Sequence, residues 1–237
     1  MEFFMPDATT KFEYKPENKV VTVVLLGNFN PIMFQPHWFG LNQIISQSEV
    51  DAIVGNTTSP FIVAPNITIF NTSQLQIQVQ ENKFSVVGLK ESFTIVKDVV
   101  KKTFERLGAM PIIAMGINAS AHFRMPDLKS YQKFGDMLTP KEGIWEDLLG
   151  DNISGDERTG GLSGLQMTNK KKDNEGMFNV IVERSVRFNP GIFISCNDHY
   201  QFDTDTDAET VMLKLEENFD SSLEKSFNIQ KSLFKNL

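Results

Sequence analysis

The spacing of apolar residues predicts a chain built mainly of strands, joined by a few amphipathic helices. A β-branched apolar run at 19–27 is typical of a buried strand. From Gln74 to Gln80 glutamines alternate with apolar residues, and a second apolar run follows Glu81 and Asn82, which predicts a hairpin with a two-residue turn. Further strands are expected at 50–54, 67–70, 111–123, 161–169, 177–188 and 192–202.

Apolar residues at steps of three or four predict two long amphipathic helices. The first covers 92–107 and ends at Gly108, a residue type that suits the backbone conformation after a helix C-terminus. The second extends over 207–235 at the end of the chain. Shorter helices are expected at 36–47, 127–138 and 141–149.

One arrangement of residues occurs twice, which predicts two similar halves. In each copy an apolar strand reaches a glycine, a phenylalanine follows seven residues later, and a proline comes shortly afterwards. The glycine and the phenylalanine are Gly27 and Phe34 in the first copy, and Gly116 and Phe123 in the second. We predict a polar tail or edge segment at 1–18, a first β-α-β(n)-α unit at 19–108, and a second unit at 109–237 with surface loops at 150–160 and 169–176.

The order of these elements predicts the fold class. Strands that follow one another without an intervening helix pair antiparallel, and each amphipathic helix must bury its apolar face on a sheet. The expected class is α+β: a tandem β-α-β(n)-α pseudo-repeat forming a mostly antiparallel sheet, with two long helices packed on one face. This layout is similar to the tandem halves of TATA-binding-protein-like folds and to helix-grip folds. The similarity is one of topology and implies nothing about function.

Composition indicates a globular protein with an aromatic core. Hydrophobic residues make up 41% of the chain, and 20 phenylalanines stand against three tyrosines and two tryptophans. Phenylalanine has no polar group to present to water, so most of these rings should be buried. No apolar run is long enough to span a membrane, and the first residues lack the pattern of a signal peptide. With Cys196 as the only cysteine, we expect a cytoplasmic protein without membrane partners.

The net charge of −7 is concentrated in one segment. Between Asp203 and Glu224, eight carboxylates stand against the single base Lys214, and the rest of the chain carries 22 charges of each sign. Binding to nucleic acid requires a basic face. The dense basic run is limited to 170–172, so nucleic acid is not the expected partner.

The acidic segment does not predict a metal site. The aspartates at 203–207 resemble the start of a calcium loop, but Ala208 and Lys214 occupy the positions at which such a loop needs Gly and Glu. Carboxylates before a helix interact favourably with the positive end of its dipole, and Thr206 with Glu209 has the spacing of a capping box. We expect neither a metal nor a cofactor.

No group of residues has the spacing of a catalytic site. His37, His122 and His199 are far apart in the sequence. Cys196 and Asp198 would share one face of a strand while His199 points to the other, because side chains alternate along a strand. No catalytic residue is therefore predicted, although an enzyme whose site is assembled from scattered residues stays an open alternative.

The candidate ligand residues gather at the first strand-to-helix turn. Asn28, Asn30, His37 and Trp38 form the densest cluster of unusual residues, and His122 lies on the expected strand of the second half. A bend that covers the sheet with aromatic rings would also explain the cluster. Turns of this kind at the end of a sheet are a common place for a ligand pocket.

The last helix predicts an interface. At 1.5 Å per residue it would extend about 43 Å, whereas a strand of six to eight residues spans about 20–27 Å. One end should therefore extend beyond the sheet and leave apolar side chains for another surface. The expected interface residues are Ile229, Leu233, Phe234 and Leu237.

These observations favour a non-enzymatic cytoplasmic interaction protein that acts through homo-oligomerisation or a protein partner. The first alternative is a small-molecule binding module with an apolar cavity between the sheet and the helices, which the Phe-rich composition would suit. The second is the enzyme with a scattered site.

Overall fold

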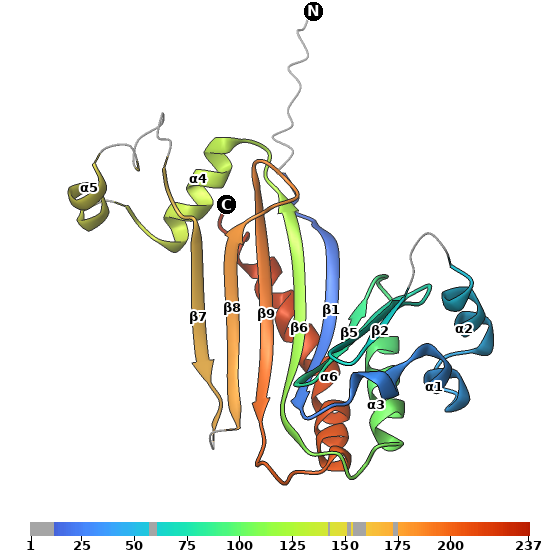
Figure 1. The fold of residues 1–237 in the computed structure, drawn as a ribbon. Coiled ribbons are helices and arrows are strands. Elements are labelled where there is room, and N and C mark those ends of the chain that lie inside the picture. The colour runs from blue at the N-terminus through green and yellow to red at the C-terminus, as the bar shows by residue number, and fades with distance from the viewer. Residues whose placement is uncertain (1–11, 57–60, 142, 151–152, 154–159, 173–174) are drawn as a thin grey trace, which may run out of the picture.

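A computed structural model describes residues 12–56, 61–141, 143–150, 153, 160–172 and 175–237. The described chain forms one antiparallel sheet of nine strands in the order β2-β3-β4-β5-β1-β6-β9-β8-β7, with helices packed against it (Figure 1). The α+β class and the antiparallel sheet expected from the sequence are confirmed.

The strands are β1 (Pro16–Gly27), β2 (Ile62–Ala64), β3 (Ile67–Asn71), β4 (Leu75–Gln80), β5 (Lys83–Gly88), β6 (Ile112–Arg124), β7 (Gly164–Lys170), β8 (Gly176–Arg184) and β9 (Gly191–Gln201). The helices are the short 3-10 helix η1 (Pro31–Phe34), α1 (Pro36–Leu41), α2 (Gln47–Val54), α3 (Thr94–Glu105), α4 (Leu128–Leu138), α5 (Ile144–Leu149) and α6 (Ala208–Ser232).

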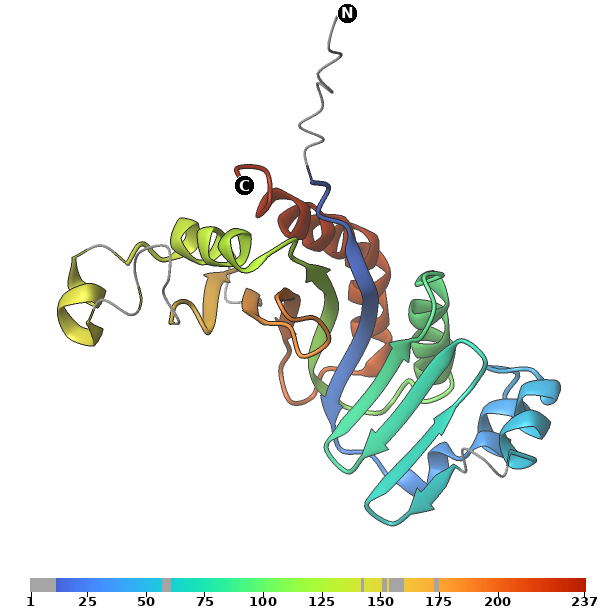
Figure 2. The same cartoon turned by 90° about the horizontal axis from the view of Figure 1, so that it is seen from above.

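Two long strands form the centre of the sheet. β1 and β6 pair antiparallel from Pro16 opposite Phe123 to Gly27 opposite Ile112. β1 also pairs with β5, and β6 with β9, so the remaining strands extend outward on both sides. Seen from above, α6 runs along the sheet beside α3, and none of the described helices covers the opposite face of β1 and β6 (Figure 2).

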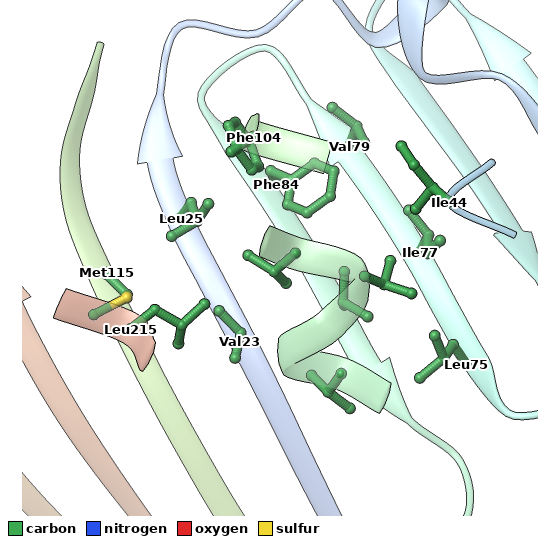
Figure 3. Packing of buried hydrophobic residues seen from close by; sticks show 14 of the residues in the cluster. Val23, Leu25, Ile44, Leu75, Ile77, Val79, Phe84, Phe104, Met115 and Leu215 are labelled. Atoms are coloured by element: carbon green, nitrogen blue, oxygen red, sulfur yellow. The ribbon is translucent and has the colours of Figure 1, made fainter. Parts of the chain in front are cut away.

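The larger core lies between α3, the first half of α6 and the strands from β4 to β6. On β1, alternate residues Val21, Val23 and Leu25 are fully buried, as the apolar run predicted. The rings of Phe84 on β5 and Phe104 on α3 meet edge to face with centroids 5.0 Å apart (Figure 3). Such aromatic pairs stabilise a core beyond the area that they bury.

A smaller core lies under the second half of α6 and α4. It contains Phe123 of β6, Phe134 of α4 and Phe234, which follows α6. The ring centroid of Phe234 lies 4.7 Å from that of Phe123 and 4.9 Å from that of Phe134. Phe34 and Phe123 hold equivalent positions in the two copies of the repeated arrangement, so each is expected to anchor the core of its half. Both are buried, one in each core.

Two sequence predictions about the elements are wrong. Residues 50–54 form part of helix α2 and not a strand, because Ser46 caps the helix by accepting a hydrogen bond from the Glu49 N–H, a Ser-x-x-Glu signal that the strand assignment overlooked. The cap of α6 is also different. Asp207, and not Thr206, accepts the Thr210 N–H, 2.9 Å from nitrogen to Oδ1.

Several expected boundaries also move. β1 begins at Pro16, within the segment predicted as a tail or edge, and β7 begins at Gly164. The expected loop at 150–160 lies mostly outside the described residues. The helix expected at 36–47 is shorter and ends at Leu41. Of the helices that the structure describes, none combines the length and the hydrophobicity needed to cross a membrane.

Candidate functional site

The residues predicted to bind a ligand do not surround one described pocket. Asn28, Asn30 and His37 are exposed around η1 and the start of α1. Trp38 is half-buried, and its ring contacts Phe34 with centroids 5.6 Å apart. This segment covers one end of the sheet with aromatic rings, which was the structural interpretation of the same cluster.

His122 lies far from these residues, toward the other end of β6. The ten residues that separate it from Ile112 correspond to about 33 Å of strand. Its Nδ1 is 2.9 Å from the Ser185 Oγ, which also accepts the N–H groups of Arg187 and Phe188. With both lone pairs occupied, the Ser185 hydroxyl donates to His122.

This His–Ser pair therefore holds a turn. A serine nucleophile needs an accessible oxygen and a base whose orientation a third group maintains. Here the Ser185 Oγ binds two backbone N–H groups and His122 is only 9% exposed. Burial, and secondarily the charge of Arg187, lower the pKa of His122. The pair has the geometry of a structural contact.

A second polar cluster is buried beneath α6. The Lys171 ammonium, just after β7, lies 2.6 Å from Asp198 Oδ1 on β9 and sits over the Tyr200 ring. Asp198 Oδ2 accepts hydrogen bonds from Tyr200, at 3.1 Å, and from Ser222 of α6. Neither atom of the ion pair has a hydrogen bond to a further described residue.

Burial governs the electrostatics of this cluster. It lowers the pKa of Lys171, and the contact with Asp198 opposes that shift only in part. It also raises the pKa of Tyr200, as does the negative charge of Asp198. The sequence spacing related Asp198 only to Cys196 and His199, as a possible catalytic group. A usable signal was present, because Asp198 shares one face of β9 with Ile194, Cys196 and Tyr200, which point to the core.

The predicted interface at the end of α6 is only partly available. Ile229, Leu233 and Leu237 are partly buried. The expectation that Phe234 lies exposed is wrong, since its side chain is 5% exposed between Phe123, Phe134 and the stacked ring of Tyr14. Deletion of residues 228–237 would therefore remove the Phe234 ring from the smaller core. A partner at this end stays a prediction.

The outer edge of β7 is the most exposed part of the described sheet. Among the described strands β7 pairs with β8 alone, and six of its seven residues are exposed. Met167, at its centre, is 61% exposed. An unpaired edge presents backbone N–H and C=O groups to another strand, and proteins usually shorten, bend or cover such edges.

A charge is placed over this edge. Gly164 pairs with Glu183 of β8, and a Cβ added at Gly164 would lie 3.7 Å from the Glu183 Cγ. The Glu183 side chain is therefore next to the glycine, one strand in from the edge. At the other end of the strand Lys170 is exposed on the same face, because six residues separate it from Gly164.

Helix α5 adds apolar surface beyond the same edge. None of its residues is buried, and Ile144, Trp145, Leu148 and Leu149 are all exposed. Both views place α5 beyond β7, away from the rest of the sheet (Figures 1 and 2). Apolar clusters of this kind mark interaction surfaces.

Comparisons with known proteins leave these surfaces to be interpreted from their chemistry. A scan against models of protein families and a search of curated proteins found no match. Among the residues that the structure describes, no three His, Cys, Asp or Glu side chains are grouped to hold a metal ion.

Proposed function

We propose that this is a non-enzymatic interaction protein that works as a homodimer, in which the β7 edges of two copies pair antiparallel about a twofold axis. The observation that carries the proposal is the exposed β7 edge, whose seven residues complement a second copy of themselves. The two sheets would then form one continuous sheet, as in other interactions by strand addition.

The register follows from symmetry and the strand length. Residues that lie opposite each other in an antiparallel pair have side chains on the same face of the sheet. The twofold axis therefore lies between one residue and its own copy. Only Met167, at the centre of β7, gives all seven residues a partner. Met167 then lies opposite its own copy, and this places an exposed apolar side chain at the dyad. The remaining pairs are Gly164 with Lys170, Leu165 with Asn169, and Gln166 with Thr168.

The charges at the ends of the strand support this register. Lys170 of one copy would lie opposite Gly164 of the other, with Glu183 on the next strand. Two strand spacings are about 9.5 Å, a gap that a lysine and a glutamate can bridge when only a glycine lies between them. Symmetry creates two such ion pairs. Lysine on an edge strand commonly prevents pairing, but here each has a carboxylate opposite it.

Helix α5 supports the same interface. A second copy beside β7 would occupy the side of the sheet on which Ile144, Trp145, Leu148 and Leu149 are exposed. Burial of apolar surface contributes roughly 25 cal/mol per Å², and tryptophan is a frequent anchor of interfaces.

We also propose that the chain is a tandem repeat. In support, β1 and β6 begin the two predicted units and pair at the centre of the sheet, and the last strand of each unit, β5 or β9, lies next to them. Each unit then closes with a helix, α3 or α6, on the same face. The test is separate expression of 12–108 and 109–237. Reassociation of the two fragments would support paired units, and aggregation of both fragments would oppose them.

The first test of the dimer introduces a charge at the twofold axis. Met167→Lys places two ammonium groups opposite each other, so we expect the mass measured by light scattering to fall from twice 26.8 kDa to that of one chain. Leu213→Lys is the matched control, because Leu213 is 62% exposed, nearly the same as Met167, but belongs to α6 and not to the β7 edge. A monomeric wild type at micromolar concentration, or a dimeric Met167→Lys, would overturn the proposal.

The register is tested by exchange of charges and by cross-linking. Lys170→Glu should weaken the dimer because it faces Glu183, and adding Glu183→Lys should restore it. Met167→Cys should form a disulfide-linked dimer on mild oxidation, since opposed Cβ atoms are about 4.5–5.5 Å apart. Leu213→Cys is the control, and Cys196 does not interfere because it is buried. Without rescue or selective cross-linking, the dimer would use another surface.

A further inference from the structure

A groove of about 570 Å³ lies at the end of the sheet opposite α1, between the beginning of β1 and the end of α6. It is within the range of small-molecule pockets, about 300–1,000 Å³. One wall is formed by 12–16 and Lys19, and the other by Phe227, Gln230 and Lys231 of α6 with the residues that follow it. The groove is separate from the β7 edge.

Aromatic residues line the interior of the groove. The rings of Phe12, Tyr14, Phe123, Phe227 and Phe234 line it. From Phe227 to Phe234 the chain advances about 10 Å, at 1.5 Å per residue. A length of this kind suits an extended chain better than a single compact ring.

The rim of the groove is basic, in a protein with a net charge of −7. Lys15, Lys19, Lys231 and Lys235 line it, and Glu13 is the one acidic residue among the lining. Lys15 lies 3.0 Å from Glu13 and Lys19 lies 3.4 Å from Glu91. Lys231 and Lys235 have no carboxylate partner among the described residues. Lysine stems can cover an apolar wall while their ammonium groups face an anion.

A buried polar side chain in the lining is incompletely paired. Gln230 is 2% exposed, and its Nε2 donates to the Ala119 carbonyl at 3.0 Å. Its Oε1 has no hydrogen-bond partner among the described residues. A buried acceptor without a donor costs about 1–3 kcal/mol, so such atoms usually indicate a water or ligand position.

We propose that this groove binds a long-chain carboxylate, with the apolar chain along the aromatic rings and the carboxylate between Lys231 and Lys235. The aromatic lining would contact the alkyl chain of the ligand, and the basic rim would contact its carboxylate. A bound water would supply the donor that the Gln230 Oε1 lacks. The site does not depend on the proposed dimer, since none of its residues belongs to β7 or α5.

The test is calorimetric titration of the full chain with dodecanoate, with dodecanol as the uncharged probe and inorganic phosphate as the anion without a chain. We expect one dodecanoate per chain, dodecanol at least ten-fold weaker, and no heat from phosphate. Equal binding of dodecanoate and dodecanol would show an apolar groove without anion recognition, and absence of dodecanoate binding would refute the site.

Substitutions locate the binding. The double variant Lys231→Met, Lys235→Met should weaken dodecanoate at least ten-fold and leave dodecanol unchanged. Lys102→Met, at an exposed position of α3, is the control and should bind like wild type. Unchanged dodecanoate affinity in the double variant would place the site elsewhere. Because both lysines are exposed, unfolding of the double variant is not expected, and a melting curve verifies this.

Discussion

The two halves of the sheet pack against different kinds of side chain, and the buried residues of α6 change from apolar to polar along its length. In its first half the buried residues are apolar, among them Leu215 and Phe219. In its second half Ser222, Ser226 and Gln230 are buried, and they bond to Asp198, to the Ser222 carbonyl and to Ala119. β7, at the end of the second side, has no helix over its outer edge in the described chain.

This difference relates packing to available binding surface. The first side, with β1 to β5, is closed by a continuous apolar core that includes η1 and α1. The second side has an exposed edge at β7, and the half of α6 that covers it buries Ser222, Ser226 and Gln230. Proteins tend to depart from well-packed structure where they bind something else. The β7 edge lies on the second side, and the groove lies where the two sides meet, between the beginning of β1 and the end of α6.

The largest expected effect concerns the two cores. Phe34→Ala and Phe123→Ala should each reduce the free energy of unfolding by about 3–5 kcal/mol, since each removes a buried ring. Chemical denaturation measures this. If the halves form one cooperative unit, fluorescence and circular dichroism should follow a single transition in both variants. A loss below about 1 kcal/mol at either site would contradict its role as an anchor.

The buried ion pair should give the next largest effect. Asp198→Asn leaves the Lys171 ammonium without its partner, and we expect a loss of about 3 kcal/mol in unfolding free energy. Adding Lys171→Met removes the unpaired charge and should recover most of that loss. The double-mutant cycle fails to support the pair if the two changes are simply additive.

A smaller effect is expected at the start of α6. Asp207→Ala removes the side chain that caps the helix and should cost about 1 kcal/mol. Asp207→Asn keeps an acceptor and should cost less. Alanine at Asp203 and Asp205 provides the control, because neither carboxylate accepts the Thr210 N–H. Stabilisation of the wild type by calcium in thermal melts would contradict a purely structural role for this segment.

The smallest effect is electrostatic and depends on pH. Glu216 on α6 bonds to Lys101 at 2.6 Å and to Lys97 at 2.9 Å on α3, and these contacts lower its pKa to about 2. A lowered carboxyl pKa contributes stability above the unfolded value of 4.5, and this contribution is lost as the pH falls toward 2. Solvent screening limits it to less than about 1 kcal/mol.

Glu216→Gln should therefore differ from wild type at pH 6 and converge with it near pH 2, as measured by urea denaturation. Glu217→Gln, at the neighbouring exposed position, is the control. A constant difference between Glu216→Gln and wild type across this pH range would show that packing, and not charge, links α3 to α6.

Local patterns in the sequence were sufficient for most elements. The alternation from Gln74 to Gln80 and the turn at Glu81 and Asn82 predicted the β4–β5 hairpin, which pairs Gln80 with Lys83. The local patterns predicted the wrong element where two of them favoured different structures. The apolar residues at 50–54 suit a strand, but the cap at Ser46 and the spacing of Val50 and Ile53 determine a helix.

The sites depended on contacts between distant parts of the chain. Lys171 and Asp198 meet because β7, β8 and β9 are neighbours in the sheet, and Ser222 joins them only through α6. No spacing in the sequence indicates that three such elements converge. The groove likewise combines the first described residues with the last ones.

The α+β class, the antiparallel pairing and the buried faces of the strands could be predicted from local patterns alone, because these depend on the period of apolar residues within short segments. Tertiary structure decided that Phe234 is buried, that the β7 edge is exposed, and that lysines from both ends of the chain surround one groove. The physical reason is that exposure and charge at a surface are set by which segments pack together, and that is a property of the whole fold.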